Sequence, residues 1–118
     1  MLYTNLNHIE SAEEYARIIN ENENVMIICG RMGPLCIPVY RIAVELEEEY
    51  RNVKIYDMEY DHPESYFFHA LPEVRDFEEI PFTLYYKNGE VVKATAGIQT
   101  KTQVKAILDQ EFGATVNA

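Results

Sequence analysis

The stretch that decides the fold is IPFTLYYKNGEVV, which runs from Ile80 to Val92. Aromatic and β-branched residues flank Asn88-Gly89 on both sides, as in two strands, and Asn-Gly readily adopts the positive φ angles of a tight turn. The stretch therefore predicts a β-hairpin. Within it, Tyr85 and Tyr86 are expected to divide between the core and the surface, because successive side chains of a strand point to opposite faces.

Two capping boxes predict a helix near each end of the chain. In Ser11-Ala-Glu-Glu14 a hydroxyl can accept from a free amide of the first turn, and the carboxylate three residues later can return the bond. Apolar residues follow at helical spacing as far as Asn20 to Asn24. Thr100-Lys-Thr-Gln103 has the same pattern and opens a last helix, with one apolar face made of Val104, Ile107, Leu108 and Phe112.

The middle of the chain alternates strands and helices. Val25 to Ile28 is a continuous apolar run, typical of a strand covered on both faces. An apolar helical stripe over residues 37–50, a strand over 53–58 and a short helix over 65–71 follow. With a short edge strand at Leu2 to Leu6, the order βαβαβαββα predicts an α/β fold with a central mixed sheet flanked by helices on both faces.

Length and charge limit the possible functions. The 118 residues are enough for one domain with its own core, so residues 1–118 are expected to form a single domain. The net charge of −10 repels phosphate backbones and anionic headgroups, so neither nucleic acid nor a membrane is an expected partner. The N-terminal residues do not resemble a signal peptide, which favours a cytoplasmic protein, and disorder is expected only from Gly113 to Ala118.

The only two cysteines lie in the segment CGRMGPLC, from Cys29 to Cys36. This segment leads from an apolar strand into the N-terminus of a predicted helix, where a thiol can be activated. Two cysteines in a chain that can build its own core do not resemble a secreted disulfide framework. Any sulfur chemistry here is therefore expected to be reactive rather than structural.

In these features the chain resembles the thioredoxin family over nearly its whole length. The most specific part is the C-terminal half, with Ile80-Pro81, a strand, Lys-Asn-Gly-Glu at residues 87–90, Gly97 and the closing helix. The resemblance implies a thioredoxin-like fold and a cis peptide bond before Pro81, beside the active site. Between Pro63 and Pro81 the chain has about six residues more than the family pattern.

The family's Cys-Gly-Pro-Cys box is not preserved. An ungapped count along the second helix places Cys36 on the family's shielded second cysteine and Gly33 on the attacking first cysteine. The family's tryptophan then falls at Met32, and its buried acid falls at Ile27 or Ile28. A gapped alignment instead places Met32-Gly33-Pro34-Leu35 on the box, and then neither family cysteine is matched. The resemblance therefore implies an atypical member.

One functional hypothesis is a redox protein whose only possible centre is Cys29 and Cys36, with weak or absent general disulfide reductase activity. Such a protein would act on protein clients and would use a reductant of the thioredoxin-reductase type. A disulfide requires Cα atoms within about 7 Å, which sequence spacing alone does not establish. The structural alternative is that Cys29 is a buried small hydrophobic residue at the end of a strand.

The second hypothesis is a binding module that is redox-inactive. In the family, three segments form the client groove, and they correspond here to Met32-Gly33-Pro34, Glu79-Ile80-Pro81 and Ala96-Gly97-Ile98. The backbone of Ile80 could pair with an extended peptide, as in β-augmentation. The partner would then be a protein or peptide. The structural alternative, equally expected, is that Pro81 and Gly97 are present only because the fold requires them.

Metal binding and cofactor chemistry have little support in the sequence. His8, His62 and His69 lie in separate predicted elements without ligand spacing, so no metal site is expected. No glycine-rich phosphate loop is present, and no cofactor is expected. His62, which precedes Pro63, is expected to be a solvated turn residue.

Overall fold

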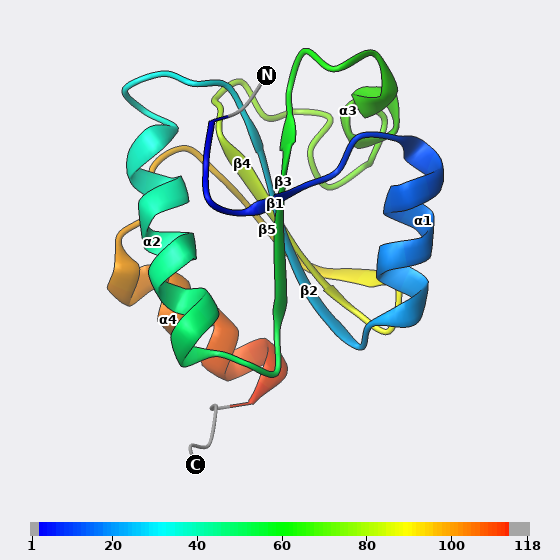
Figure 1. Cartoon of the computed structure of the whole chain (residues 1–118). Coiled ribbons are helices and arrows are strands. Elements are labelled where there is room, and N and C mark those ends of the chain that lie inside the picture. Colours follow the sequence, from blue (N-terminus) through cyan, green and yellow to red (C-terminus); the bar gives the residue numbers. More distant parts are fainter. Residues whose placement is uncertain (1–2, 114–118) are drawn as a thin grey trace.

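A five-stranded mixed sheet forms the centre of the protein in the structure, a computed structural model that describes residues 3–113 (Figure 1). The strand order is β1-β3-β2-β4-β5. The first three strands run parallel, whereas β4 is antiparallel to both β2 and β5. The predicted mixed sheet is therefore confirmed. Its strands are β1 (Asn7–His8), β2 (Asn24–Gly30), β3 (Lys54–Glu59), β4 (Phe82–Lys87) and β5 (Glu90–Ala96).

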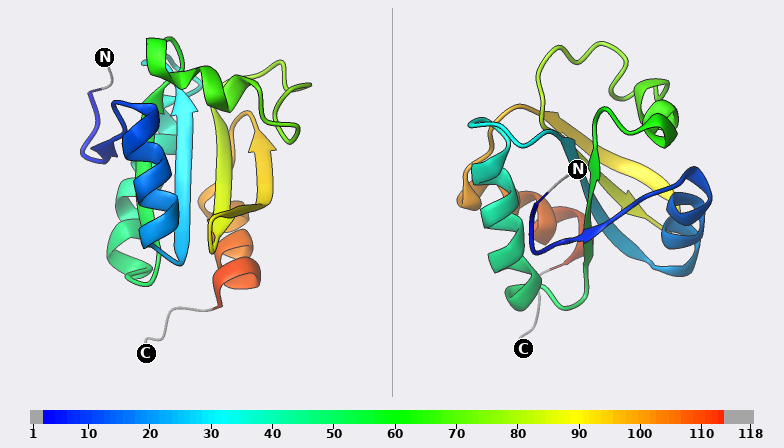
Figure 2. Two further views of the ribbon diagram at one scale, coloured as in Figure 1. Left: turned by 90° about the vertical axis from the view of Figure 1, so that its right-hand side faces the viewer. Right: turned by 45° about the horizontal axis from the view of Figure 1, so that its top comes forward.

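Helices cover both faces of this sheet, as the element order predicts. One face carries α2 (Ile37–Glu49) and α4 (Lys101–Phe112), and the other carries α1 (Ala12–Glu21) and α3 (Tyr66–His69) (Figure 2). A single 3-10 turn, η1 (Pro63–Ser65), precedes α3. The predicted helix over 65–71 is thus shorter than expected, and a turn replaces its last residues.

The capping hydroxyls predicted at both helix starts are confirmed, but the predicted return bond is present only at Thr100. At the first helix the Glu14 carboxylate accepts instead from the Glu10 amide, at 2.8 Å. The Ser11 hydroxyl accepts from the Glu14 amide at 3.0 Å. The Thr100 hydroxyl accepts from the Gln103 amide at 3.1 Å, while the Gln103 side chain accepts from the Thr100 amide at 2.8 Å. The hairpin is also as predicted, because Asn88 and Gly89 have φ angles of 53° and 85°. Local sequence signals thus set the boundaries of these elements.

The core consists of two layers, one on each side of the sheet. Alternate residues of β2 supply both layers: Met26 and Ile28 pack under α2 and α4, whereas Ile27 and Cys29 pack under α1 and α3. The same geometry corrects the prediction for the hairpin tyrosines. Tyr85 and Tyr86 point to opposite faces, but both are buried because helices cover both faces.

The edge strand lies later in the chain than predicted. Instead of Leu2 to Leu6, residues Asn7 and His8 pair with β3, and the residues before them form a bend. The bend has a local cause, because the Thr4 hydroxyl accepts from the Leu6 amide at 3.1 Å. Leu2 and the predicted disordered tail after Gly113 lie outside the described residues. Within residues 3–113, no helix has the length and apolar character needed to cross a bilayer.

Candidate functional site

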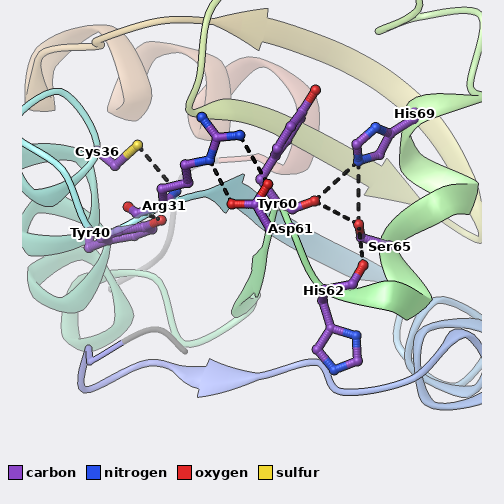
Figure 3. A network of polar contacts seen from close by, with 8 residues as sticks. All are labelled: Arg31, Cys36, Tyr40, Tyr60, Asp61, His62, Ser65 and His69. Atoms are coloured by element: carbon purple, nitrogen blue, oxygen red, sulfur yellow. Dashed lines mark hydrogen bonds and ion pairs between the residues drawn. The ribbon is translucent and has the colours of Figure 1, made fainter.

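The candidate site lies where β2 ends and the chain turns into α2. At this edge of the sheet the central strand β2 has a parallel neighbour, β3, and an antiparallel neighbour, β4. The loop from Arg31 to Cys36 therefore meets the segment that enters β4 and the turn that leaves β3. Figure 3 shows this loop beside the turn after β3.

Beneath the loop is a close-packed set of four residues, Gly30, Cys36, Tyr40 and Pro81, here called the buried floor. A Cβ atom on Gly30 would lie 2.8 Å from Tyr40 Oη, 3.0 Å from Cys36 Sγ and 3.1 Å from Pro81 Cβ. Atoms from three separate segments therefore converge on one point. Glycine is required at this point because any side chain would overlap them.

Above the floor, residues Arg31 to Leu35 form the exposed rim. The side chains of Met32 and Leu35 are 37% and 55% exposed. Gly33 lies between them, and a Cβ atom there would meet no atom within 4 Å. The Gly33 carbonyl accepts from the Cys36 and Ile37 amides, both at 3.0 Å, which closes the first turn before α2. A side chain at position 33 would therefore project into open space at the N-terminus of a helix.

The structure does not pair the two thiols. Cys29 and Cys36 are free, and both are buried. They pack on opposite faces of the sheet, Cys29 on the α1 side and Cys36 on the α2 side, because Cys29 is in the strand and Cys36 caps the helix. A disulfide would require one of the two side chains to cross to the other face of the sheet, which the alternation of side chains along β2 opposes.

Burial also makes Cys29 a poor nucleophile. The pKa of its thiol lies far above the usual range, first because burial disfavours the thiolate and then because Asp61 adds negative charge. The sulfur of Cys36 is held in place, since it accepts from the Arg31 amide at 3.4 Å. The burial and the raised pKa of Cys29 match the structural alternative, in which this residue is a small buried hydrophobic side chain.

The surroundings of Cys36 favour the ungapped placement of the family box. Cys36 is only 2% exposed and shares the buried floor with Pro81, as a shielded second cysteine would. In that placement Gly33 would stand three residues earlier at the position of the attacking cysteine, where an added Cβ atom would meet no neighbour. The gapped placement would put Leu35 on the shielded cysteine, but Leu35 is more than half exposed.

Two of the three predicted groove segments are joined directly. The Ile80–Pro81 peptide bond is cis, and the Pro81 carbonyl accepts from the Gly97 amide at 2.8 Å. Ile98, the next residue, has 51% of its side chain exposed. Within residues 3–113, the amide and carbonyl of Ile80 form no hydrogen bond, so this backbone is available to a partner strand.

The third segment is arranged differently, because Met32 contacts the N-terminal part of the chain. Its sulfur accepts from the Tyr3 amide at 3.3 Å. Met32 and Tyr3 border a cavity of about 510 Å³, whose other walls include Ile37, Tyr40 and Val44 of α2. The rim therefore borders the N-terminal segment through Met32, while Gly33 and Pro34 remain open at the top of the loop.

A polar network beside the rim was not predicted from the sequence. The Arg31 guanidinium donates two hydrogen bonds to Asp61, at 2.6 and 2.9 Å, and lies 5.1 Å from the centre of the Tyr60 ring (Figure 3). The hydrogen bonds from Arg31 lower the pKa of the Asp61 carboxyl. The Arg31 carbonyl accepts from Tyr40 Oη at 3.0 Å. Arg31 thus links the rim to the turn after β3.

A buried acid is also present, on a neighbouring strand rather than at Ile27 or Ile28. Asp57 of β3 is fully buried and lies beside Ile28 on the α2 face. Its carboxylate accepts from the Thr4 hydroxyl and interacts with His8 Nδ1 at 2.5 Å. Burial raises its pKa, although these two contacts oppose the effect. The signal in the sequence was its inward position, in step with Val53 and Ile55.

The histidines serve separate local structures. His8 binds Asp57, and His69 Nε2 lies 3.3 Å from the Tyr60 carbonyl. His62 is not the solvated turn residue that was expected. Its Nδ1 accepts from the Glu64 amide at 3.0 Å, and only 21% of its side chain is exposed, because it caps η1. Among residues 3–113, no three His, Cys, Asp or Glu side chains cluster as metal ligands.

Solved thioredoxin structures match this chain over nearly its whole length. A Plasmodium falciparum thioredoxin is 20% identical with a TM-score of 0.74, covering 90% of this chain and 99% of that one. A mutant thioredoxin from Halobacterium salinarum NRC-1 is 15% identical with a TM-score of 0.76, covering 98% of this chain and 99% of that one. A Malassezia sympodialis thioredoxin is 17% identical with a TM-score of 0.74, covering 93% of this chain and 95% of that one. No family model and no curated protein sequence matches the chain. These likenesses show that the chain has a thioredoxin-like fold, as the resemblance implied.

Proposed function

We propose that this thioredoxin-like protein binds an extended segment of a client protein and does not carry out dithiol exchange. The observation that supports it best is at the N-terminus of α2. The position that would hold an attacking thiol is Gly33, which has no side chain, and both thiols of the chain are buried on opposite faces of the sheet. Exchange requires an accessible thiolate.

The binding part of the proposal depends on the segment that enters β4. The unpaired backbone of Ile80 is adjacent to Pro81, and Pro81 is hydrogen-bonded to Gly97. A peptide strand paired with Ile80 would add main-chain hydrogen bonds, and the exposed Ile98 side chain would contact an alternate side chain of the peptide. The client would thus be an extended, partly apolar segment.

Thiol chemistry tests the first half of the proposal. We expect a thiol-specific reagent to modify almost no cysteine in the native protein and both cysteines after unfolding. We also expect insulin reduction in the presence of dithiothreitol to equal that of Cys36→Ser. Reversible loss of thiols under mild oxidation, with reductase activity that Cys36→Ser abolishes, would instead establish Cys29 and Cys36 as a redox centre.

Binding tests the second half. The probe is a set of fluorescent ten-residue peptides with alternating apolar and polar residues. We expect Ile98→Asp to weaken their binding, because it places a charge beside the groove. Val92→Asp is the matched control, since Val92 is also an exposed apolar residue, of β5, but lies near the hairpin turn at the far end of the strand. Equal binding by both variants would contradict the proposed groove.

A further inference from the structure

The extra residues between Pro63 and Pro81 build a cavity next to the proposed groove. The turn after α3 returns the chain to β4 and borders a partly open cavity of about 260 Å³. Ile80 lines this space, so it is continuous with the backbone that would pair with a client. Its walls include the rings of Tyr60, Phe77 and Phe82.

Two carboxylates border the same cavity. Glu78 and Glu79 both line it and are both exposed. Within the described chain, neither forms an ion pair or a hydrogen bond. The Glu79 carboxylate also reaches the groove, because its Oε1 lies 2.9 Å from the point where a Cβ of Gly97 would be. Arg75 also lines the cavity and carries one positive charge. The two carboxylates therefore leave one negative charge in excess.

We propose that this cavity receives a lysine or arginine side chain of the client, so that the protein selects extended segments with a basic residue. The proposal rests on the proposed function, since the segment itself binds at Ile80. Carboxylates and aromatic rings together stabilise a cation through ion pairing and cation–π contact. The net charge of −10 also attracts cationic segments from a distance.

A carboxylate and an aromatic ring already bind one basic side chain of this protein. The Arg31 guanidinium donates to the Asp61 carboxylate and lies over the Tyr60 ring (Figure 3). Tyr60 also lines the cavity. A basic side chain of the client in the cavity would thus meet carboxylates and the Tyr60 ring. The Arg31 side chain already contacts the same ring together with the Asp61 carboxylate.

Peptides that differ at one position test this inference. A ten-residue peptide with alternating apolar residues carries Lys, norleucine or Glu, with the substituted position moved along the peptide. We expect one position at which Lys binds more tightly than norleucine, by about two- to fivefold for each carboxylate engaged, and Glu more weakly. The Glu78→Gln and Glu79→Gln double variant should abolish this preference, measured as the ratio of the dissociation constants of the norleucine and Lys peptides.

The control variant has the same net charge but an unaltered cavity. Glu13 in α1 and Glu90 in β5 are exposed carboxylates that do not line the cavity, so Glu13→Gln with Glu90→Gln should keep the preference for Lys. A preference lost equally in both double variants would overturn the inference, because only the overall charge would then matter. If no peptide binds, or if Ile98→Asp and Val92→Asp bind peptides equally, the proposed function itself fails. If peptides bind without preference, only the cavity assignment fails.

Discussion

The buried floor and the exposed rim lie one above the other, yet they differ sharply in packing. In the floor, Tyr40, Cys36 and Pro81 approach Gly30 so closely that no Cβ atom fits. In the rim, a Cβ atom on Gly33 would meet nothing within 4 Å. The floor is therefore closely packed around Pro81, whereas position 33 of the rim has open space, as the proposed absence of an attacking thiol requires.

This difference separates structure from chemistry. Close packing in the floor keeps Pro81 and the start of α2 in fixed positions, and it does so without an accessible thiol. The rim is not closely packed in this way. Because its residues are exposed, substitutions there should change stability little. A change in the rim should thus alter chemistry and leave the fold intact, and a change in the floor should do the reverse.

The largest expected effect comes from Gly33→Cys in the rim. Residues i and i+3 of a hydrogen-bonded turn have Cα atoms within about 7 Å, which a disulfide can span, and Cys36 donates its amide to the Gly33 carbonyl. The helix N-terminus should favour the introduced thiolate. We expect reagent-accessible thiols to rise from about zero to about one per chain, together with measurable insulin reduction.

The matched control for this gain is Gly33→Cys combined with Cys36→Ser. It should retain the accessible thiol but lose insulin reduction, because no second thiol can resolve the mixed disulfide. If the single variant shows an accessible thiol with ordinary reactivity and forms no disulfide on oxidation, position 33 does not face Cys36 in the required geometry.

The next effect is on stability, and it compares the two glycines directly. We expect Gly30→Ala to lower the free energy of unfolding by about 1–3 kcal/mol, because its methyl group overlaps the floor. Gly33→Ala should be neutral or stabilising by up to about 1 kcal/mol, since the site is open and its φ is not positive. Urea denaturation measures both, and equal losses would contradict the contrast in packing.

The two cysteines give a third comparison, again by urea denaturation. Cys29→Ser buries a hydroxyl that has no partner, and it should cost about 1–3 kcal/mol. Cys36→Ser should cost less, because the Arg31 amide that donates to the sulfur can donate to the hydroxyl. The reverse order would show that the Arg31 contact does not hold Cys36 in place.

Features that depend on neighbouring residues in the sequence were predictable, and features that depend on distant ones were not. Asn88-Gly89 and the capping residues Ser11 and Thr100 act within four residues, so the hairpin and helix starts are correct. The burial of both hairpin tyrosines required knowing that helices cover each face. The Arg31–Asp61 contact joins residues thirty positions apart, and no local pattern indicates it.

The smallest expected effect is a pair of opposite pH dependences, from Asp57 behind the floor and Asp61 beside the rim. Burial raises the pKa of Asp57, so the wild-type protein loses this part of its stability as pH rises through that pKa. The Arg31 hydrogen bonds lower the pKa of Asp61, so that contribution is present above the unfolded pKa of about 3.9 and is lost as pH falls.

Two variants separate these contributions, because each removes one titration. From pH 4 to pH 7, the unfolding free energy of Asp57→Asn relative to wild type should rise. Between pH 5 and pH 3, that of Asp61→Asn relative to wild type should rise as the pH falls, since wild type then loses its Arg31 pairing. The Asp61 effect should be the smaller of the two, because half of its side chain is exposed and solvent screens the ion pair. Urea denaturation across this pH range measures both differences in unfolding free energy. Slopes of the same sign against pH would mean that Asp57 behind the floor and Asp61 beside the rim do not differ in their electrostatic environment.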